Sequence, residues 1–246
     1  MIREGLVREE PLEKDGFLLR GREVSRVEAF SDAVFGFALT LLVVTLDIPK
    51  NTEDLMGILR GIPVFAVCFA MLYFLWNCHY VYCRRYGLQD TTVRILTGVL
   101  LFTVLLFVYP LKYIFTLFIN GFLGMDRSVN NAIHTEFDLE IAFVVYGLGW
   151  FVTLALFGCL YIHAGRSRLE PALSATERFL TRSAAVGFFI TASLGLVSVA
   201  LAMSLPGAWK TVAGFLYCLT GAIAKMHAGW ERRQFKEKSA AKPPSD

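Results

Sequence analysis

Charged and polar side chains that interrupt two long apolar segments are the residues of this 246-residue sequence best placed to do chemistry. Together with one neighbouring phenylalanine they form two groups, namely Arg26, Phe30, Ser31 and Asp32 in the first segment, and Trp76 and His79 in the second. A charged side chain costs at least about 2.5 kcal/mol at the centre of a membrane-spanning helix, so each one needs a partner or contact with water. A carboxylate, an imidazole, a hydroxyl and an indole N–H can satisfy one another by hydrogen bonding.

Asp32 and His79 are the pair that we expect to meet. If the first segment is a helix that runs outward and the second runs back, both residues lie at a similar depth near the inner membrane surface. Trp76 and Ser31 are then available as further donors. Two interpretations stay open: a structural polar clamp between the two helices, and a His79 whose protonation near neutral pH changes that clamp.

The elements that must position these residues are long apolar helices. Hydrophobic residues make up 55% of the sequence and charged residues 18%, with a mean hydropathy of +0.53, which excludes an ordinary water-soluble enzyme as the default class. At about 1.5 Å per residue, segments of roughly 17 to 25 residues cross a hydrocarbon core of about 30 Å. Six such segments are present, at 27–48, 61–83, 95–118, 139–163, 179–203 and 211–228. The sequence therefore predicts an all-α, polytopic membrane protein.

The basic residues predict how these six helices are oriented. Eighteen Lys and Arg residues lie in the N-terminal segment, the second-to-third loop, the fourth-to-fifth loop and the tail, whereas the other three loops hold four. By the positive-inside rule both termini are cytoplasmic. We expect a cytoplasmic segment at 1–26, a transmembrane domain at 27–230 and a disordered cytoplasmic tail at 231–246, in the cell (inner) membrane. The net charge of +3 is not gathered on one basic face, so no nucleic-acid partner is expected.

The first helix is predicted to have three different surfaces. Four bulky apolar residues fall on one stripe at the spacing i, i+4, i+7 and i+11, namely Phe37, Leu41, Val44 and Ile48. Asp32 points away from that stripe. A third face carries small residues that permit close helix contact, namely Ala29, Ala33, Gly36 and Thr40. Because a helix that only faces lipid needs no such differentiation, we expect protein to enclose it, although the stripe alone is also compatible with plain core or lipid contact.

The polar groups and their spacing resemble a known family. The matching residues are Arg26-xxx-Phe30-Ser31-Asp32, then Thr40-Leu41-Leu42, Trp76-xx-His79 on the second helix and Pro110 late in the third. This pattern is similar to that of the transmembrane protein 175 family, which comprises lysosomal potassium-leak channels of animals and their shorter bacterial relatives. The match is close over the first three helices. A single six-helix unit, rather than two in tandem, resembles the bacterial branch.

The resemblance implies a potassium-permeable homotetramer in the lipid bilayer, with four first helices around a central pore. It places apolar constriction layers at Phe37, Leu41 and Val44, with Ile48 on the same stripe and the Thr40 hydroxyl nearby. The motif residues are implied to form a packing network that holds the pore helix and binds no ions, namely Arg26, Phe30, Ser31, Asp32, Trp76 and His79. No catalytic residue, metal site or cofactor is expected, and potassium is the permeant ion. The sequence also lacks a TVGYG-like filter segment.

One residue departs from the family pattern, which usually has Ile or Leu where this chain has Phe37. Four phenyl rings that meet on one axis narrow the pore or seal it. An apolar ring offers no ligands to replace water, so it discriminates between ions by how much hydration they must shed. Potassium holds its water less tightly than sodium, so we expect a real but modest preference for potassium.

Two other classes of membrane protein stay open as alternatives. A secondary transporter would favour broken helices, polar groups at the midplane and repeat symmetry, none of which is evident in the sequence. A haem- or quinone-binding oxidoreductase would use histidines, and His79, His163 and His227 are all predicted near the cytoplasmic side. Only that similar depth supports it, since His163 and His227 lie close to the interface.

Overall fold

The computed structural model describes residues 17–44, 49–123, 136–206 and 212–220, and its elements are helices. In chain order they are α1 (Arg26–Val44), α2 (Thr52–Arg60), α3 (Ile62–Tyr86), α4 (Thr91–Leu123), α6 (Glu136–Arg166), α7 (Ala175–Ser204), α8 (Val212–Phe215) and the 3-10 helix η2 (Leu216–Leu219). Within this part of the chain, four helices are long and apolar enough to cross a membrane: α3, α4, α6 and α7.

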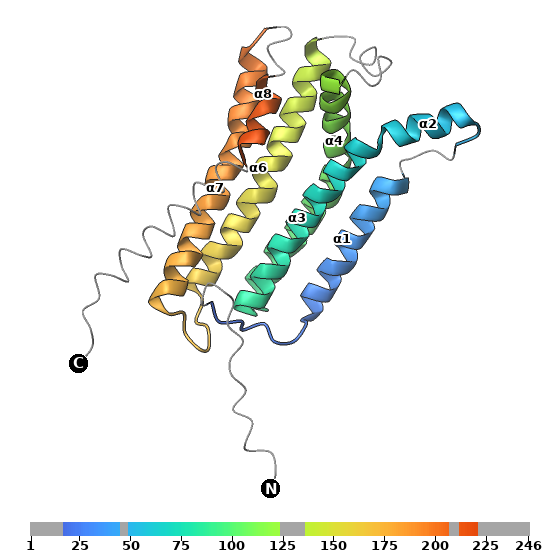
Figure 1. Cartoon of the computed structure of the whole chain (residues 1–246). Helices are drawn as coiled ribbons and strands as arrows, with labels where there is room; N and C mark the ends of the chain where they lie inside the picture. Colours follow the sequence, from blue (N-terminus) through green and yellow to red (C-terminus); the bar gives the residue numbers. More distant parts are fainter. Residues whose placement is uncertain (1–16, 45–48, 124–135, 207–211, 221–246) are drawn as a thin grey trace, which may run out of the picture.

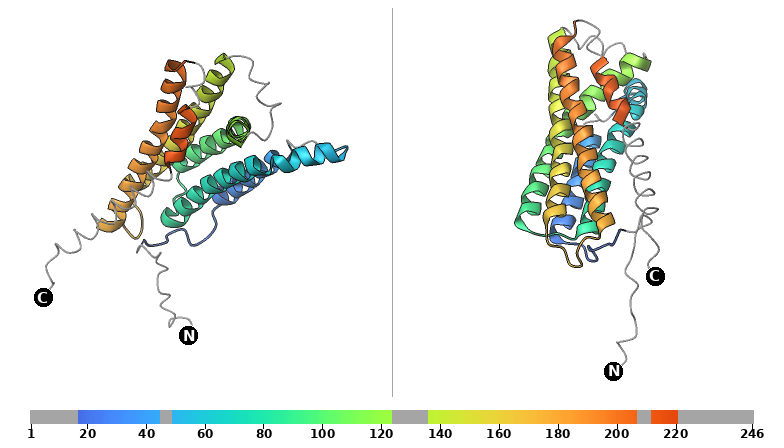
Figure 2. Two further views of the ribbon diagram at one scale, coloured as in Figure 1. Left: turned by 45° about the horizontal axis from the view of Figure 1, so that its top comes forward. Right: turned by 90° about the vertical axis from the view of Figure 1, so that its left-hand side faces the viewer.

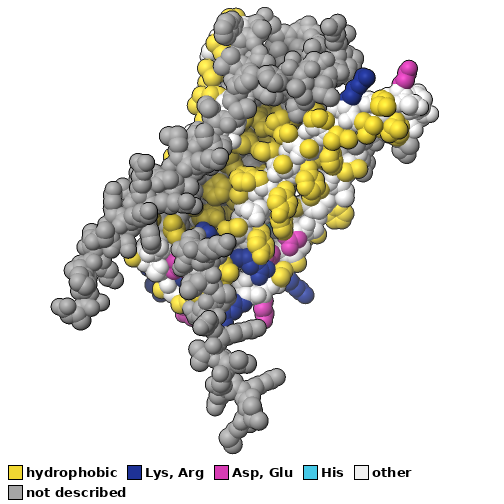
Figure 3. Space-filling model, viewed as in Figure 1, with side chains coloured by type: hydrophobic (Ala, Val, Ile, Leu, Met, Phe, Trp, Pro, Cys, Tyr) yellow, Lys and Arg dark blue, Asp and Glu magenta, His cyan; other side chains and the backbone are white. Residues whose placement is uncertain are grey.

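Five long helices run side by side in alternating directions (Figure 1, Figure 2). α7 packs along α6, α6 packs against α4, and α4 contacts both α1 and α3. α1 also contacts α3 and lies at the edge of the bundle, whereas α2 projects away from it (Figure 1). We call the end at which α1, α4 and α7 begin the basal end. In the view of Figure 3, hydrophobic side chains cover the long helices, while charged ones gather at the basal end and on α2.

Local sequence signals explain several helix ends. Ser174 and Glu177 form a capping box at the start of α7, in which each side chain accepts a backbone N–H of the other residue. Pro63 lies in the first turn of α3, where a backbone N–H has no helical partner. Gly87 ends that helix in the left-handed conformation, with φ of 60°.

Small residues let α6 and α7 approach closely. Gly147 and Gly195 face each other, and a Cβ added at Gly195 would clash with the carbonyl oxygen of Gly147. Only glycine fits there, as is common where helices pack in membranes. Beside this contact the buried Trp150 donates its indole N–H to the Thr191 carbonyl oxygen at 2.9 Å, which gives its polar atom a partner on the neighbouring helix.

The predicted spans fall on these helices, with ends that differ by a few residues. Span 61–83 falls on α3, 95–118 on α4, 139–163 on α6 and 179–203 on α7. α1 covers most of span 27–48, and α8 and η2 lie within span 211–228. Residues 45–48, the end of the last span and the predicted tail at 231–246 lie outside the described residues.

α2 is a helix that the sequence analysis does not predict, because it is short and none of its residues is buried. Its signals are nevertheless present. The Asn51 side chain accepts the Asp54 N–H at 2.8 Å as an N-cap. Glu53 in the first turn and Arg60 in the last also match the polarity of the helix dipole.

Candidate functional site

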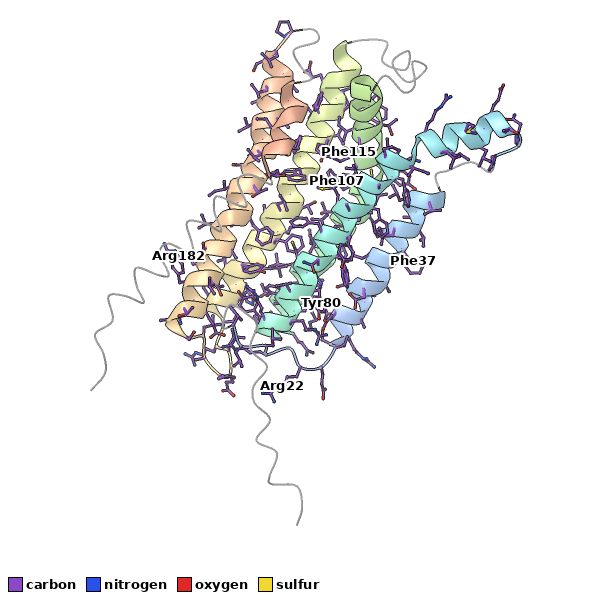
Figure 4. All side chains as sticks on the ribbon, viewed as in Figure 1. Arg22, Phe37, Tyr80, Phe107, Phe115 and Arg182 are labelled. Carbon is purple, nitrogen blue, oxygen red and sulfur yellow. The ribbon has the colours of Figure 1, made fainter. Side chains whose placement is uncertain are left out.

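α1 presents two opposite faces, and only one of them packs within the chain. The packed face consists of Glu28, Ser31, Val34, Phe35, Ala38 and Leu42, all buried. The open face consists of Ala29, Phe30, Ala33, Gly36, Phe37 and Thr40, all exposed. At about 3.6 residues per turn, these two sets lie on opposite sides of the helix. Figure 4 shows Phe37 on the side of α1 that points away from the other long helices.

The predicted apolar stripe forms part of the open surface. Phe37 is 67% exposed and Leu41 is half-buried. The side chain of Val44 and the whole of Ile48 lie outside the described residues. The Thr40 hydroxyl is exposed and donates to the Phe37 carbonyl oxygen at 2.8 Å, so its lone pairs remain on the open face.

The small residues on the open face have no close neighbour in the part of the chain that the structure describes. A Cβ added at Gly36 would meet nothing within 4 Å, and Ala29 and Ala33 are exposed. Within the described residues, α1 is therefore enclosed on one side, where it lies at the edge of the bundle and packs mainly against α3 and α4. The described residues of the chain therefore provide only part of the enclosure that the sequence predicts for α1.

Asp32 is held by the indole of α3. Trp76 donates its Nε1–H to Asp32 Oδ1 at 2.7 Å, and such a bond to an ionised acceptor is stronger than one between neutral groups. The Trp76 ring is in turn stacked on Tyr80, with centroids 5.6 Å apart, and lies 5.3 Å from the ring of Tyr73. The predicted contact between Trp76 and Asp32 is thus confirmed, and it joins α1 to α3.

The predicted pairing of Asp32 with His79 is wrong. His79 is 1% exposed and faces Cys83, with 3.7 Å between Nδ1 and Sγ, while Asp32 lies on the exposed side of α1. Ser31 also serves another partner, because its hydroxyl donates to the Val27 carbonyl oxygen at 2.7 Å. Among the described residues, Asp32 therefore bonds to Trp76 and His79 faces Cys83, and no hydrogen bond joins the two groups.

The buried acid at the start of α1 is Glu28, to which the sequence analysis assigns no role. It is 3% exposed, and its Oε1 lies 2.5 Å from Arg84 Nη2 at the end of α3. Arg26 and Phe30, the first two motif residues, are instead exposed. The sequence does contain a signal for this role of Glu28. It is an acid two residues after Arg26 in an apolar segment, where a charge needs a partner.

The histidines form no common ligand set in the described part of the chain. His163 Nε2 lies 2.6 Å from Asp90 Oδ2, His79 is enclosed beside Cys83, and His227 lies outside the described residues. Burial acts to raise the pKa of Asp90, but hydrogen bonds from the Val93 N–H and from His163 outweigh it, so that pKa is lowered. His163 therefore holds the loop before α4 rather than facing a cofactor.

A family model matches the first part of the chain. The model described as the endosomal/lysosomal potassium channel TMEM175 covers residues 26–107, which include α1, α3 and the polar residues described above. Among curated proteins, a potassium channel of Marivirga tractuosa is 34% identical over 211 residues, which is 82% of this chain and 85% of that protein. A potassium channel of Streptomyces collinus is 24% identical over 78% of this chain and 92% of its own length.

Solved structures agree with this match. A crystal structure of a T38A variant of the potassium channel MtTMEM175, in complex with a nanobody fusion protein, superposes with a TM-score of 0.77. That chain is 31% identical, and the match covers 92% of this chain and all of the other. A lysosomal potassium-selective channel TMEM175 homologue from Chamaesiphon minutus has a TM-score of 0.57 at 23% identity, over 82% of this chain and 96% of the other, and shares the fold.

Proposed function

Because this chain belongs to the TMEM175 family of potassium channels, we propose that four copies of it assemble around a common axis and form a potassium-permeable pore lined by α1. The resemblance expected from the motifs is confirmed, as is an all-α, multi-pass membrane protein. A channel is not an enzyme. The transporter and oxidoreductase alternatives are not favoured by the family.

The proposal rests on the exposure of Phe37. The helix face around this residue differs from a protein surface that contacts lipid. Around Phe37 the open face carries small residues, Ala33 and Gly36, and the Thr40 hydroxyl. Small residues allow helices to approach closely, and a polar group at the helix surface requires water or a partner within the membrane. A central, partly hydrated axis between copies of α1 supplies both.

In the proposed pore, Phe37 forms the main constriction. Four rings contributed by four copies offer no oxygen ligands, so an ion passes at the cost of part of its hydration shell, and the ring gates by dewetting. Leu41, Val44 and Ile48 form further apolar layers beyond it, and Thr40 provides a hydroxyl beside the first. Potassium sheds water more readily than sodium, so the preference for potassium is modest and no cofactor is involved.

The polar network positions α1 and binds no ion. The Trp76–Asp32 hydrogen bond fixes the helix to α3, and the buried Ser31 and His79 fill the contact between these two helices. Arg26 and Phe30 begin the helix at the basal end. Following the distribution of basic residues, we place that end and both termini on the cytoplasmic side of the cell (inner) membrane.

Purified protein reconstituted in vesicles tests the proposal. Native mass spectrometry of the same sample is expected to give a mass of four chains, and a potassium gradient is expected to drive passive flux that exceeds the flux in empty vesicles and does not saturate as a carrier does. Flux that requires a counter-ion would indicate a transporter. A different number of copies, or no flux above empty vesicles, would contradict the proposal.

A further inference from the structure

The residues that precede α1 form an ordered strap across the basal end. We call residues 17–25 the strap. Phe17 is fully buried and meets the Tyr86 ring edge-on, with centroids 5.5 Å apart. The Arg85 guanidinium lies 4.8 Å from the centre of the Phe17 ring. The Leu18 N–H donates to Glu177 Oε1 at 2.9 Å. The strap therefore begins beside the N-terminal end of α7, on the far side of the bundle from α1 (Figure 1).

A buried ion pair fixes the strap to α7. Arg20 donates from Nη1 and Nη2 to the two carboxylate oxygens of Glu177, both at 2.9 Å, and the two side chains are only 4% and 5% exposed. This two-point geometry fixes direction as well as distance. Arg20 also donates to the Pro171 carbonyl oxygen at 2.9 Å, so one side chain joins the strap, the α6–α7 loop and the first turn of α7.

The other end of the strap is bonded to α3 and, through it, to α1. The Gly21 N–H donates to the Arg84 carbonyl oxygen at 2.9 Å, and Arg84 Nη1 donates back to the Gly21 carbonyl oxygen at 2.8 Å. A Cβ at Gly21 would clash with the Cys83 carbonyl oxygen, so the two backbones touch. The same Arg84 holds Glu28 at the start of α1.

This attachment lies on the side of α1 opposite to the proposed constriction. Glu28 is buried on the packed face, whereas Phe37 is 67% exposed on the open face. Nine residues separate them, which at about 3.6 residues per turn is two and a half turns, so their side chains point in opposite directions. A connection through Glu28 therefore holds the base of α1 toward the bundle. This direction is opposite to the one in which the Phe37 side chain points.

We propose that Arg20 and Glu177 are positioning residues which, through the strap, keep the base of α1 away from the pore axis. The inference rests on the proposed function, because the axis is that of the tetramer. If the connection is weakened, apolar side chains on the open faces of four α1 helices gain contact by moving toward one another. The constriction then narrows and potassium flux falls, although neither Arg20 nor Glu177 lines the path.

The flux experiment uses conservative variants that preserve side-chain shape. For R20K and E177Q we expect potassium flux per tetramer to fall by roughly two- to thirtyfold, the range that substitutions within coupling networks produce. The exchange R20E/E177R is expected to restore part of the flux relative to R20E alone. R182Q is the matched control, because Arg182 is an exposed arginine on α7 near the same end. Flux per tetramer equal to that of R182Q would overturn the proposal.

A distance measurement separates this inference from the proposed function. A spin-labelled non-natural residue at position 29, on the open face near the base of α1, reports the separation of the copies without any need for conduction. We expect shorter separations in R20K and E177Q than in R182Q. Unchanged separations in an intact tetramer would overturn the strap mechanism and leave the pore proposal intact, whereas loss of flux from the parent protein would contradict the pore itself.

Discussion

Two phenylalanines with almost the same exposure lie on very different surfaces. Phe37 on α1 is 67% exposed and Phe102 on α4 is 68% exposed. Along α4 most outward residues are large and apolar, namely Ile95, Val99, Phe102, Leu106, Tyr109 and Tyr113, with Gly98 between them. Along α1 the residues around Phe37 are alanine, glycine and threonine. The exposure of a single ring therefore does not indicate what the surface contacts. The residues around the ring are the better indicator.

The contrast follows from what lipid and protein each require. A continuous row of bulky side chains, as on α4, presents an apolar surface that suits acyl chains. Small residues lose contact area with lipid but let another helix come close. Asp32 and Thr40 also place polar atoms on the exposed side of α1. Each makes one hydrogen bond inside the chain and keeps further lone pairs, which acyl chains cannot satisfy. We therefore expect α1 to contact another copy of the chain and the outward side of α4 to contact lipid.

The largest effect is expected from removing one of the two rings. Phe37→Ala should raise potassium flux in vesicles on the order of tenfold, equivalent to a barrier lower by about 1.4 kcal/mol, because the narrowest apolar layer becomes wider and easier to wet. Phe102→Ala removes the same side chain from a surface of equal exposure and should leave flux per tetramer within the error of the assay. Equal responses of the two variants would remove the basis for the pore assignment.

A glycine on each surface allows the two surfaces to be compared by their effect on tetramer assembly. A Cβ at Gly36 on α1 and a Cβ at Gly98 on α4 would each meet no described atom of the chain within 4 Å. Valine at either position therefore fits the subunit fold equally well, apart from its lower helix propensity. We expect Gly36→Val to lower the tetramer fraction in native mass spectrometry and Gly98→Val to leave it unchanged. A tetramer that tolerates Gly36→Val would show that the copies meet elsewhere.

A smaller effect, on stability, is expected from the indole that holds α1. Trp76→Phe removes the N–H that bonds the Asp32 carboxylate, and a bond to a charged group contributes roughly 1.5–3 kcal/mol. Trp150→Phe removes a bond of 2.9 Å to a neutral carbonyl, for which about 0.5–1.5 kcal/mol is expected. Denaturation of both variants in the same detergent compares them. If the cost of Trp76→Phe persists undiminished in an Asp32→Ala background, which has no acceptor at this position, the hydrogen bond is not its source.

The sequence predicts the helical fold and the role of Trp76 because both follow from local pattern. Hydropathy over about 20 residues is enough to locate a membrane helix, and an indole near a carboxylate has few other acceptors in an apolar setting. The pairing of Asp32 with His79 was incorrect because similar depth does not fix rotation about the helix axis. His79 is turned into the α3 contacts beside Cys83 and Phe35.

The strap and α2 show what local pattern leaves out. The Arg20–Glu177 pair joins residues 157 positions apart. In the local sequence, Glu177 fits a different role, as the last residue of a capping box. Nothing local indicates that the same carboxylate also receives an arginine from the N-terminal segment. The short α2 lies entirely at the surface, so no hydrophobic run marks it. Long-range pairs and short surface helices of this kind are therefore recognised only in the folded structure.

The smallest effect is expected at the base of α4. An exposed pair holds this helix, whereas buried connections hold the base of α1. Asp90 and His163 are 42% and 26% exposed, so solvent screens their attraction, and Asp90→Asn should cost less than about 1 kcal/mol. Because the pKa of Asp90 is lowered in the folded protein, its contribution is present above the ordinary carboxyl range and is lost as the pH falls below it. Denaturation at pH 7 and at pH 2 should therefore show a smaller difference between variant and parent at the lower pH. Potassium flux should be unchanged at pH 7, because this pair holds α4 and not α1, the helix proposed to line the pore. A fall in flux would mean that the position of α4 also sets the constriction.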